Sequence, residues 1–296
     1  MLPGAVIDVA SLVGETRAAL RASQERLHED YRRSNSATAL LRGRARAVDH
    51  ALRKLWRALA MPAELALVAV GGYGRRELYP ASDVDLLFLV PEGFTGQARL
   101  EPLIGLLWDI GLDVGHSVRS VAECLAQGGQ DITIQTSLLE ARLLCGNRHL
   151  FAEFDRHVRG SIDPESFLQA KQLEQAERYA RFNDTPFALE PNSKESPGGL
   201  RDLQIILWVA RAANLGTQWQ DLARAGLVAA DEARQLARAE LFLRHLRIRL
   251  HLLAGRREDR LSFELQESLA ASYGLKASAS KRRSELLMQR YYRNAK

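Results

Sequence analysis

Residues 70–86, VGGYGRRELYPASDVDL, constrain the fold of this 296-residue chain more than any other run. They are flanked by two continuous apolar segments of buried-strand length, 65–70 and 86–90. The glycines therefore stand where one strand ends, and the aspartates stand where the next strand begins. We expect an α/β unit in which the glycine turn and the aspartates form one functional site.

The glycine turn and the aspartate pair suit the binding of a metal-bound nucleoside triphosphate. Gly71 and Gly72 let backbone N–H groups approach a phosphate closely, and a following helix N-terminus favours anions. Asp83 and Asp85 stand at i and i+2 of a strand, so they share a face about 6.5–7 Å apart and can converge on hard cations. A lone Gly-Gly is usually only a turn, but ionised carboxylates at the rim of a core are rare unless paired or bound to metal, which favours the functional interpretation.

A third carboxylate comes from the strand expected at 112–118, where alternation places Asp113 and Arg119 on one face. If this strand lies beside the one at 84–90, Asp113 joins the aspartate pair. Three clustered carboxylates repel one another and need cations to offset the repulsion. Two Mg²⁺ ions about 3.5–4 Å apart would do so and would clamp the oxygens of an in-line phosphoryl displacement. The alternative is a salt bridge from Asp113 to Arg119.

Hydrophobic periodicity divides the chain into three parts. Helices occupy residues 1–60 from Ile7 onward, with a break near residues 34–36. Residues 61–160 alternate strands with helices, and residues 161–296 are helical again. In these two parts we expect helices at 97–110, from Ser120, at 131–146, 200–213 and 230–254, and an irregular stretch at 183–199.

Composition excludes several classes of protein. No apolar span is long enough to cross a membrane, and the N-terminus lacks the basic region of a secretory signal. Two cysteines are too few for a disulfide framework or a zinc site, which fits a reducing cytoplasm. Six of the 41 basic residues are lysine and the other 35 arginine, giving a net charge of +5. They lie on helical patterns beside acids and without an aromatic stacking motif, so we interpret most as solvated helix faces and expect no nucleic-acid binding.

A second distinctive block, LEPNSKESPGGLRDLQ, occupies residues 189–204. Together with residues 71–86, GHSVR at 115–119 and LLAGRREDR at 252–260, it makes the chain resemble the nucleotidyltransferase superfamily and, within it, the bacterial protein-PII uridylyltransferases called GlnD. The resemblance covers most of residues 20–296. One departure is Ser196, where glycine is expected in this family.

The resemblance implies both a fold and a reaction. The fold is an α/β nucleotidyltransferase core, a small mixed sheet with helices, over residues 61–160. N-terminal helices precede it over 1–60, and a mostly α-helical PII-uridylyltransferase-type domain follows over 161–296. The reaction is the transfer of UMP from UTP to a tyrosine of the nitrogen-signalling protein PII, with Mg²⁺ as cofactor and pyrophosphate as product.

The resemblance also implies roles for single residues. Gly71 and Gly72 would cradle the triphosphate, while Asp83, Asp85 and Asp113 would bind metal and act in catalysis. Further candidates for contact with the nucleotide are Arg75, Ser82, Lys194 and Arg201. A simpler interpretation is that the charged residues of the second block only lock its loop to the α/β unit; these residues are Glu190, Lys194, Arg201 and Asp202.

Two alternative functions remain open at this point. No feature of the sequence indicates which nucleobase is recognised, so the chain could transfer AMP from ATP to PII instead. It could also be a non-catalytic, truncated nucleotide-binding or interaction module. The family continues into an HD hydrolase domain and two ACT domains, whereas this sequence stops at Lys296. We therefore expect neither uridylyl removal nor glutamine sensing from this polypeptide.

Overall fold

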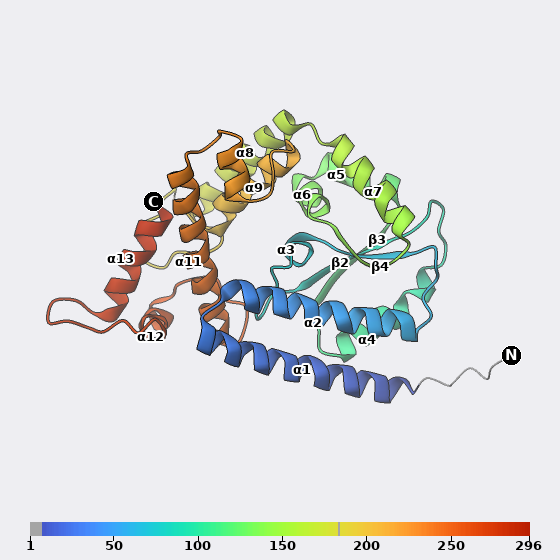
Figure 1. The fold of residues 1–296 in the computed structure, drawn as a ribbon, viewed down its shortest axis with the longest axis horizontal. Coiled ribbons are helices and arrows are strands. Elements are labelled where there is room, and N and C mark those ends of the chain that lie inside the picture. Colours follow the sequence, from blue (N-terminus) through green and yellow to red (C-terminus); the bar gives the residue numbers. More distant parts are fainter. Residues whose placement is uncertain (1–7, 183) are drawn as a thin grey trace. The chain divides into compact units, whose positions relative to one another are not determined.

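The computed structural model describes residues 8–182 and 184–296 and divides the chain into two compact units (Figure 1). The first unit contains the described residues up to Leu78 together with Ser82–Ser161. The second contains Tyr79–Ala81 and Ile162–Lys296. The loop 79–81 thus belongs with the C-terminal part of the chain, although its sequence neighbours belong with the first unit. The expectations for residues 1–7 and for Asn183 lie outside the described residues.

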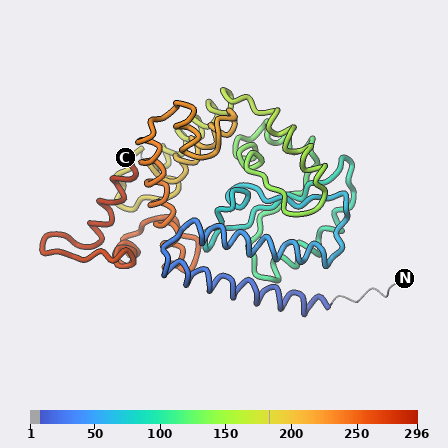
Figure 2. Tube along the Cα trace, in the orientation of Figure 1, coloured from blue at the N-terminus to red at the C-terminus, as the bar shows by residue number. Residues whose placement is uncertain are grey.

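Two long helices open the first unit, as the sequence predicts. α1 (Val9–Ser34) begins after Asp8, whose carboxylate accepts N–H groups of the first turn. Asn35, at φ 50°, ends α1 in the left-handed conformation, which asparagine tolerates. Ser36 then caps α2 (Ala37–Ala58), so the predicted break between the helices is confirmed. The two helices pack against each other along the chain path traced in Figure 2.

A small mixed sheet forms the centre of the first unit. Its strands are β1 (Ala66–Ala69), β2 (Val84–Leu89), β3 (Val114–Arg119) and β4 (Arg142–Gly146), in the order β3-β2-β1-β4. β1 pairs antiparallel with β2 and with β4, whereas β2 and β3 are parallel. The second and third strands therefore lie side by side, which is the condition under which Asp113 joins the aspartate pair.

Helices cover both faces of this sheet (Figure 1). The helices that follow α2 in this unit are α3 (Gly71–Gly74), α4 (Glu101–Asp109), α5 (Val121–Gln130), α6 (Ile132–Leu139) and α7 (Arg148–Ser161). Apolar side chains of α1, α2 and α4 pack in one core with Val84, Leu86 and Phe88 of β2. On the opposite face, α5 contacts β3 and α7 contacts β1 and β4. Asp85, between Val84 and Leu86, therefore faces away from the main core.

One sequence prediction for this unit is wrong, and another is confirmed in part. The helix expected at 131–146 ends at Leu139, and the strand β4 follows it. Leucines at helical spacing fit either element locally, and the long-range pairing of β4 with β1 decides in favour of the strand. The helix expected at 97–110 is a 3₁₀ turn, Gln97–Arg99, followed by α4 with a proline in its first turn.

The second unit is helical, as expected from its sequence pattern. Its helices are α8 (Pro164–Arg181), α9 (Leu200–Ala212), α10 (Trp219–Arg224), α11 (Ala230–Ala254), α12 (Phe263–Ser272) and α13 (Arg283–Ala295). The predicted helices at 200–213 and 230–254 are confirmed, and the stretch between α8 and α9 is irregular as predicted. None of the helices in the described part of the chain combines the length and apolar character needed to span a membrane.

Candidate active site

The glycine run builds a tight turn between β1 and β2. The N–H of Val70 donates to the carbonyl of Asp85 (3.1 Å), which ties the end of β1 to the start of β2. Gly71 has φ +56°, which other residues rarely adopt, and it begins the one-turn helix α3. Gly74 is needed for close packing, since a Cβ there would collide with the carbonyl oxygen of Glu140. The turn is therefore fixed directly beside Asp85.

Asp85 directs its carboxylate between two glycines. A Cβ on Gly71 would lie 3.3 Å from Oδ2 of Asp85, and a Cβ on Gly115 would lie 3.1 Å from Oδ1. Both distances are shorter than ordinary van der Waals contact, so a side chain at either position would press on the carboxylate. Because both residues are glycine, no side chain at position 71 or 115 crowds the oxygens of Asp85.

The strand register brings the three predicted aspartates to the same end of β2 and β3. Asp85 pairs with Gly115, and the N–H of Val84 donates to the carbonyl of Asp113 (2.8 Å). Asp83 and Asp113 each precede the first paired residue of their strand, so alternation places both on the face of Asp85. Asp113 is exposed, whereas Asp83 and Asp85 are half-buried. β3 begins two residues later than predicted, but the face it contributes is the expected one.

These aspartates share a face without forming a ready-made metal cluster. Across residues 8–182 and 184–296, no three His, Cys, Asp or Glu side chains gather closely enough to hold a metal ion. Mg²⁺ typically binds one or two protein carboxylates and completes its shell with waters and substrate phosphates. The i, i+2 spacing of Asp83 and Asp85 fits that donor set. Metal binding by these residues and by Asp113 stays a prediction.

The alternative role for Asp113, an ion pair with Arg119, does not agree with the strand. Asp113 directly precedes β3 and Arg119 is its last residue. A strand rises about 3.3 Å per residue, which puts the two Cα atoms roughly 20 Å apart. The side chains cannot bridge that distance, so Asp113 has another function or none.

Arg75, a predicted contact for the nucleotide, is held by carboxylates of its own unit. Its guanidinium lies 3.1 Å from Glu77 and also pairs with Glu140, whose side chain is only 2% exposed. Burial by itself would lower the pKa of Arg75, but the two carboxylates raise it, so the charge is kept and is neutralised locally. Ser82 lies half-buried just before β2. Contact of Arg75 or Ser82 with a nucleotide stays a prediction.

A buried network that sequence reasoning missed holds the glycine turn. Asp49 of α2 accepts the hydroxyl of Tyr73 (2.7 Å) and two N–H groups of Arg142 (2.8 and 3.0 Å). The Arg142 guanidinium also donates to the carbonyls of Tyr73 (3.3 Å) and Gly74 (3.2 Å), at the end of α3. Burial and the nearby Asp49 raise the pKa of Tyr73, so it donates as a neutral phenol. No local pattern marks this role of Asp49, because Tyr73 and Arg142 lie far from it in sequence.

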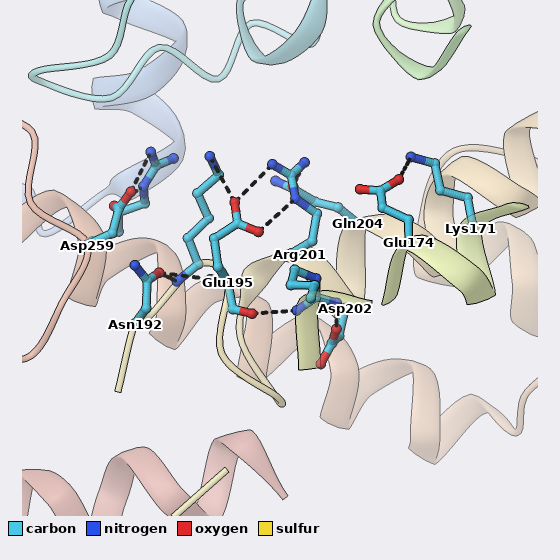
Figure 3. A network of polar contacts seen from close by, with 11 residues as sticks. Lys171, Glu174, Asn192, Glu195, Arg201, Asp202, Gln204 and Asp259 are labelled. Carbon is cyan, nitrogen blue, oxygen red and sulfur yellow. Dashed lines mark hydrogen bonds and ion pairs between the residues drawn. The ribbon is translucent and has the colours of Figure 1, made fainter. Parts of the chain in front are cut away.

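In the second unit, Lys194 and Arg201 share the carboxylate of Glu195. Figure 3 shows Glu195 beside Arg201. Oε1 of Glu195 lies 3.1 Å from Nζ of Lys194 and 3.1 Å from a terminal nitrogen of Arg201. Burial by itself raises the pKa of Glu195, but the two cations lower it to about 2. Burial, and then the charge of Arg201, lowers the pKa of Lys194. Two positive charges and one negative charge leave one net positive charge beside the start of α9.

Asp202 anchors the irregular loop to α8. Its carboxylate accepts the N–H of Gly198 (2.7 Å) and the hydroxyl of Tyr179 (2.6 Å), and it pairs with Arg178. All of these contacts lie within the second unit. Asp202 therefore anchors the loop within the second unit, while Lys194 and Arg201 retain their excess positive charge. The simpler interpretation, that this block locks its loop to the α/β unit, stays a prediction.

Ser196, the departure from the family pattern, also closes this loop. Its hydroxyl accepts the N–H of Asn192 (2.9 Å), and Oδ1 of Asn192 accepts the N–H of Lys194 (2.9 Å). Gly198, at φ +77°, packs so closely on the carbonyl of Ala295 that a Cβ would collide with it. Packing on α13 thus explains Gly198, whereas a Cβ on Gly199 would lie 2.8 Å from the carbonyl oxygens of Lys194 and Ser196 in the loop itself.

Comparison with known proteins gives a consistent result over nearly the whole chain. Residues 166–296 match the family described as GlnD PII-uridylyltransferase. The bifunctional uridylyltransferase/uridylyl-removing enzyme of Aromatoleum aromaticum is 57% identical over 290 residues, which is 97% of this chain and 34% of that enzyme. Enzymes of the same name from Cupriavidus pinatubonensis and Nitrosospira multiformis are 52% and 51% identical over 288 residues, covering 96% and 95% of this chain and 33% and 32% of the relatives.

The chain belongs to the GlnD family. The resemblance inferred from residues 71–86 and 189–204 is therefore confirmed. The chain spans about a third of the length of the curated relatives that it matches. The GlnD family match includes the loop from Lys194 to Asp202, and the identity over nearly the whole chain extends to the unit that carries the three aspartates.

Proposed function

We propose that this chain transfers UMP from UTP to a tyrosine hydroxyl of PII and releases pyrophosphate. The names of its relatives support the reaction class, and the name of the matching family supports PII as the acceptor. The observation that carries the proposal is the position of Asp85. Its carboxylate lies between Gly71 and Gly115 at the end of the sheet where Asp83 and Asp113 also lie.

The carboxylates would hold Mg²⁺ and the glycine turn would receive the triphosphate. Asp83 and Asp85 supply the hard oxygen ligands that Mg²⁺ prefers. When bound, the metal would stabilise the charge on the attacking and leaving oxygens of an in-line displacement. Gly71 lacks a side chain, and a Cβ on Gly72 would meet nothing closer than 3.6 Å, so phosphate oxygens can approach this backbone.

Asp113 is suited to accept the proton of the incoming tyrosine. A tyrosine hydroxyl has a pKa of about 10 and is a weak nucleophile at neutral pH, so a positioned base helps it. Asp113 is the exposed member of the three aspartates, at the rim of the shared face. In the reaction, the tyrosine oxygen forms a bond to the α-phosphorus of UTP, the bond from that phosphorus to the bridging oxygen breaks, and pyrophosphate leaves.

Lys194 and Arg201 would contribute positive charge toward the triphosphate. Their shared Glu195 neutralises only one of the two charges and holds both side chains in place. A preorganised pair of cations binds phosphate at a smaller entropic cost than two mobile side chains. This role follows from the family resemblance and from the residual charge of the cluster.

The proposal is tested by incubating the chain with PII and Mg²⁺ and with UTP or ATP, followed by mass spectrometry of PII. A mass increase of one UMP with UTP supports the proposal. An increase of one AMP with ATP would assign the chain as an adenylyltransferase. Binding of UTP without any change in the mass of PII would indicate a non-catalytic module.

A further inference from the structure

The loop between the glycine turn and Asp83 is held by side chains of the second unit. The chain leaves the first unit after Leu78, and Tyr79–Ala81 pack with the second unit. The N–H of Ala81 donates to Nδ1 of His251, near the end of α11, over 3.2 Å. Only Ser82 separates Ala81 from Asp83, so this hydrogen bond fixes the backbone close to a predicted metal ligand.

His251 is oriented for this contact by Asp259. Nε2 of His251 lies 3.2 Å from Oδ1 of Asp259, and the imidazole has no exposed surface. Because Nδ1 accepts the N–H of Ala81, the ring proton stands on Nε2 and points to the carboxylate. The ring therefore accepts and donates at the same time as a neutral imidazole, which agrees with the lowering of the His251 pKa by burial.

Arg247 holds the other end of the same loop. Its guanidinium lies 4.1 Å from the centre of the Tyr79 ring, and its Nε lies 2.6 Å from Oδ1 of Asp259. The carbonyl of Asp259 in turn accepts the N–H of Ser193 (2.7 Å) in the irregular loop. Asp259 thus orients both His251 and Arg247, which contact this loop.

We propose that His251, Arg247 and Asp259 are positioning residues for the carboxylates of the nucleotidyl-transfer site. They act through residues 79–81, which His251 and Arg247 contact. Two trans peptides join Ala81 to Asp83, so the two Cα atoms cannot be more than about 7.6 Å apart. Fixing Ala81 therefore limits where the Asp83 carboxylate can stand. The inference rests on the proposed function and goes beyond it by giving the run 252–260 a role in the reaction.

The test compares two substitutions of His251, one that keeps a hydrogen-bond acceptor for the N–H of Ala81 and one that removes it. In His251→Asn, the side-chain oxygen stands about where Nδ1 stands and can still accept the N–H of Ala81. In His251→Leu, a side chain of similar size offers no acceptor. Gln266→Leu serves as a matched control, because Gln266 is buried in the same unit and donates to Leu189 and Leu261, away from the loop 79–81.

The first measurement is amide hydrogen exchange in the whole chain, which needs no activity. In the unsubstituted chain and in His251→Asn, the amides of Ala81 and Val84 are expected to be protected. In His251→Leu both should exchange at least about tenfold faster, since the loop is released and the adjoining pair between Val84 and Asp113 loosens. In Gln266→Leu both should stay protected. Unchanged exchange at Ala81 and Val84 in His251→Leu would overturn the proposal.

The second measurement is UMP transfer to PII as a function of Mg²⁺. Substitution of residues that orient metal ligands typically costs about 10–100-fold in activity or metal affinity. We expect a loss of this size in His251→Leu, recovery of most of it in His251→Asn, and little change in Gln266→Leu. Equal losses in all three variants would show that His251 only stabilises its unit. If the unsubstituted chain transfers no UMP, the proposed function fails, whereas the exchange measurement still decides whether His251 holds the loop.

Discussion

The run from Gly71 to Asp85 is held by two aspartate–arginine networks that belong to different units. In the first unit, Asp49 and Arg142 hold the glycine turn through its carbonyls and through Tyr73. In the second unit, Asp259 and Arg247 hold the loop that follows, with His251 receiving the N–H of Ala81. Both networks are buried, and each aspartate binds an aromatic or imidazole group as well as the arginine.

The two networks differ in the group that meets the backbone. Arg142 donates to carbonyls, and a guanidinium offers donors only. His251 accepts an N–H with a nitrogen that can itself be protonated. The glycine turn is therefore fixed permanently, whereas the loop before Asp83 depends on a neutral histidine. The following predictions test this difference.

The largest expected effect is on stability, in Asp49→Leu. The substitution leaves the largely buried Arg142 guanidinium without its carboxylate and removes the acceptor of Tyr73. Breaking a buried ion pair in this way typically costs about 3–5 kcal/mol of unfolding free energy. Urea denaturation measures the loss. Asp49→Leu combined with Arg142→Leu should recover part of it, and a stable single variant would contradict the role given to this network.

The next effect is on activity, in Asp83→Asn and Asp85→Asn. Each change removes a charged metal ligand while keeping the size of the side chain, so we expect transfer to fall by at least about 10²–10³ with the fold intact. Turnover of PII at limiting Mg²⁺, with circular dichroism as a control for folding, measures it. Retained turnover in either variant would refute the assignment of the site.

A smaller effect is expected in Gly115→Ala. The new methyl group would lie 3.1 Å from Oδ1 of Asp85, so the carboxylate must move by a few tenths of an ångström. Unlike Gly71, Gly115 has no positive φ, so backbone strain does not confuse the result. We expect roughly a tenfold loss of transfer with little change in melting temperature, since small displacements of reacting groups are costly. A fully active variant would show that the Asp85 carboxylate does not depend on the missing side chain at position 115.

The sequence predicts candidate site residues mainly where chemistry and local pattern coincide. Gly71, Asp83 and Asp85 could be proposed because glycine turns and i, i+2 carboxylates are local signals, and the position of Asp113 on their face followed from alternation along one strand. β4 could not be predicted as a strand, since its leucines fit a helix equally well. Only its pairing with β1 distinguishes strand from helix. Asp49 and His251 were missed because the segments that they hold, at Tyr73 and Ala81, lie far away in sequence, and a lone buried acid or histidine carries no pattern.

The smallest expected effect is a pH dependence that only the second network shows. Burial, and to a lesser extent Arg247 and Arg257, lower the pKa of His251, while Asp259 opposes this. The pKa of Asp259 is held well below its usual range despite burial, by His251 and Arg247, so this carboxylate stays ionised. As the pH falls below about 6.5, the unfolded chain binds a proton at His251 before the folded chain does. The neutral histidine therefore contributes stability above that pH, and this contribution is lost as the pH falls through the lowered pKa.

Protonation of Nδ1 would also turn this nitrogen of His251 into a donor facing the N–H donor of Ala81. The hydrogen bond would be lost, so the loop should be released over the same pH range. Amide exchange at Ala81 and melting temperature, both followed from neutral to mildly acidic pH, measure the two effects. In His251→Asn, which keeps an acceptor that does not titrate, the Ala81 amide should stay protected, while the backbone of Tyr73 and Gly74 should be insensitive to pH in both proteins. If Ala81 in the unsubstituted chain is equally protected across this range, His251 does not release the loop on protonation, and the two networks do not differ in the way proposed here.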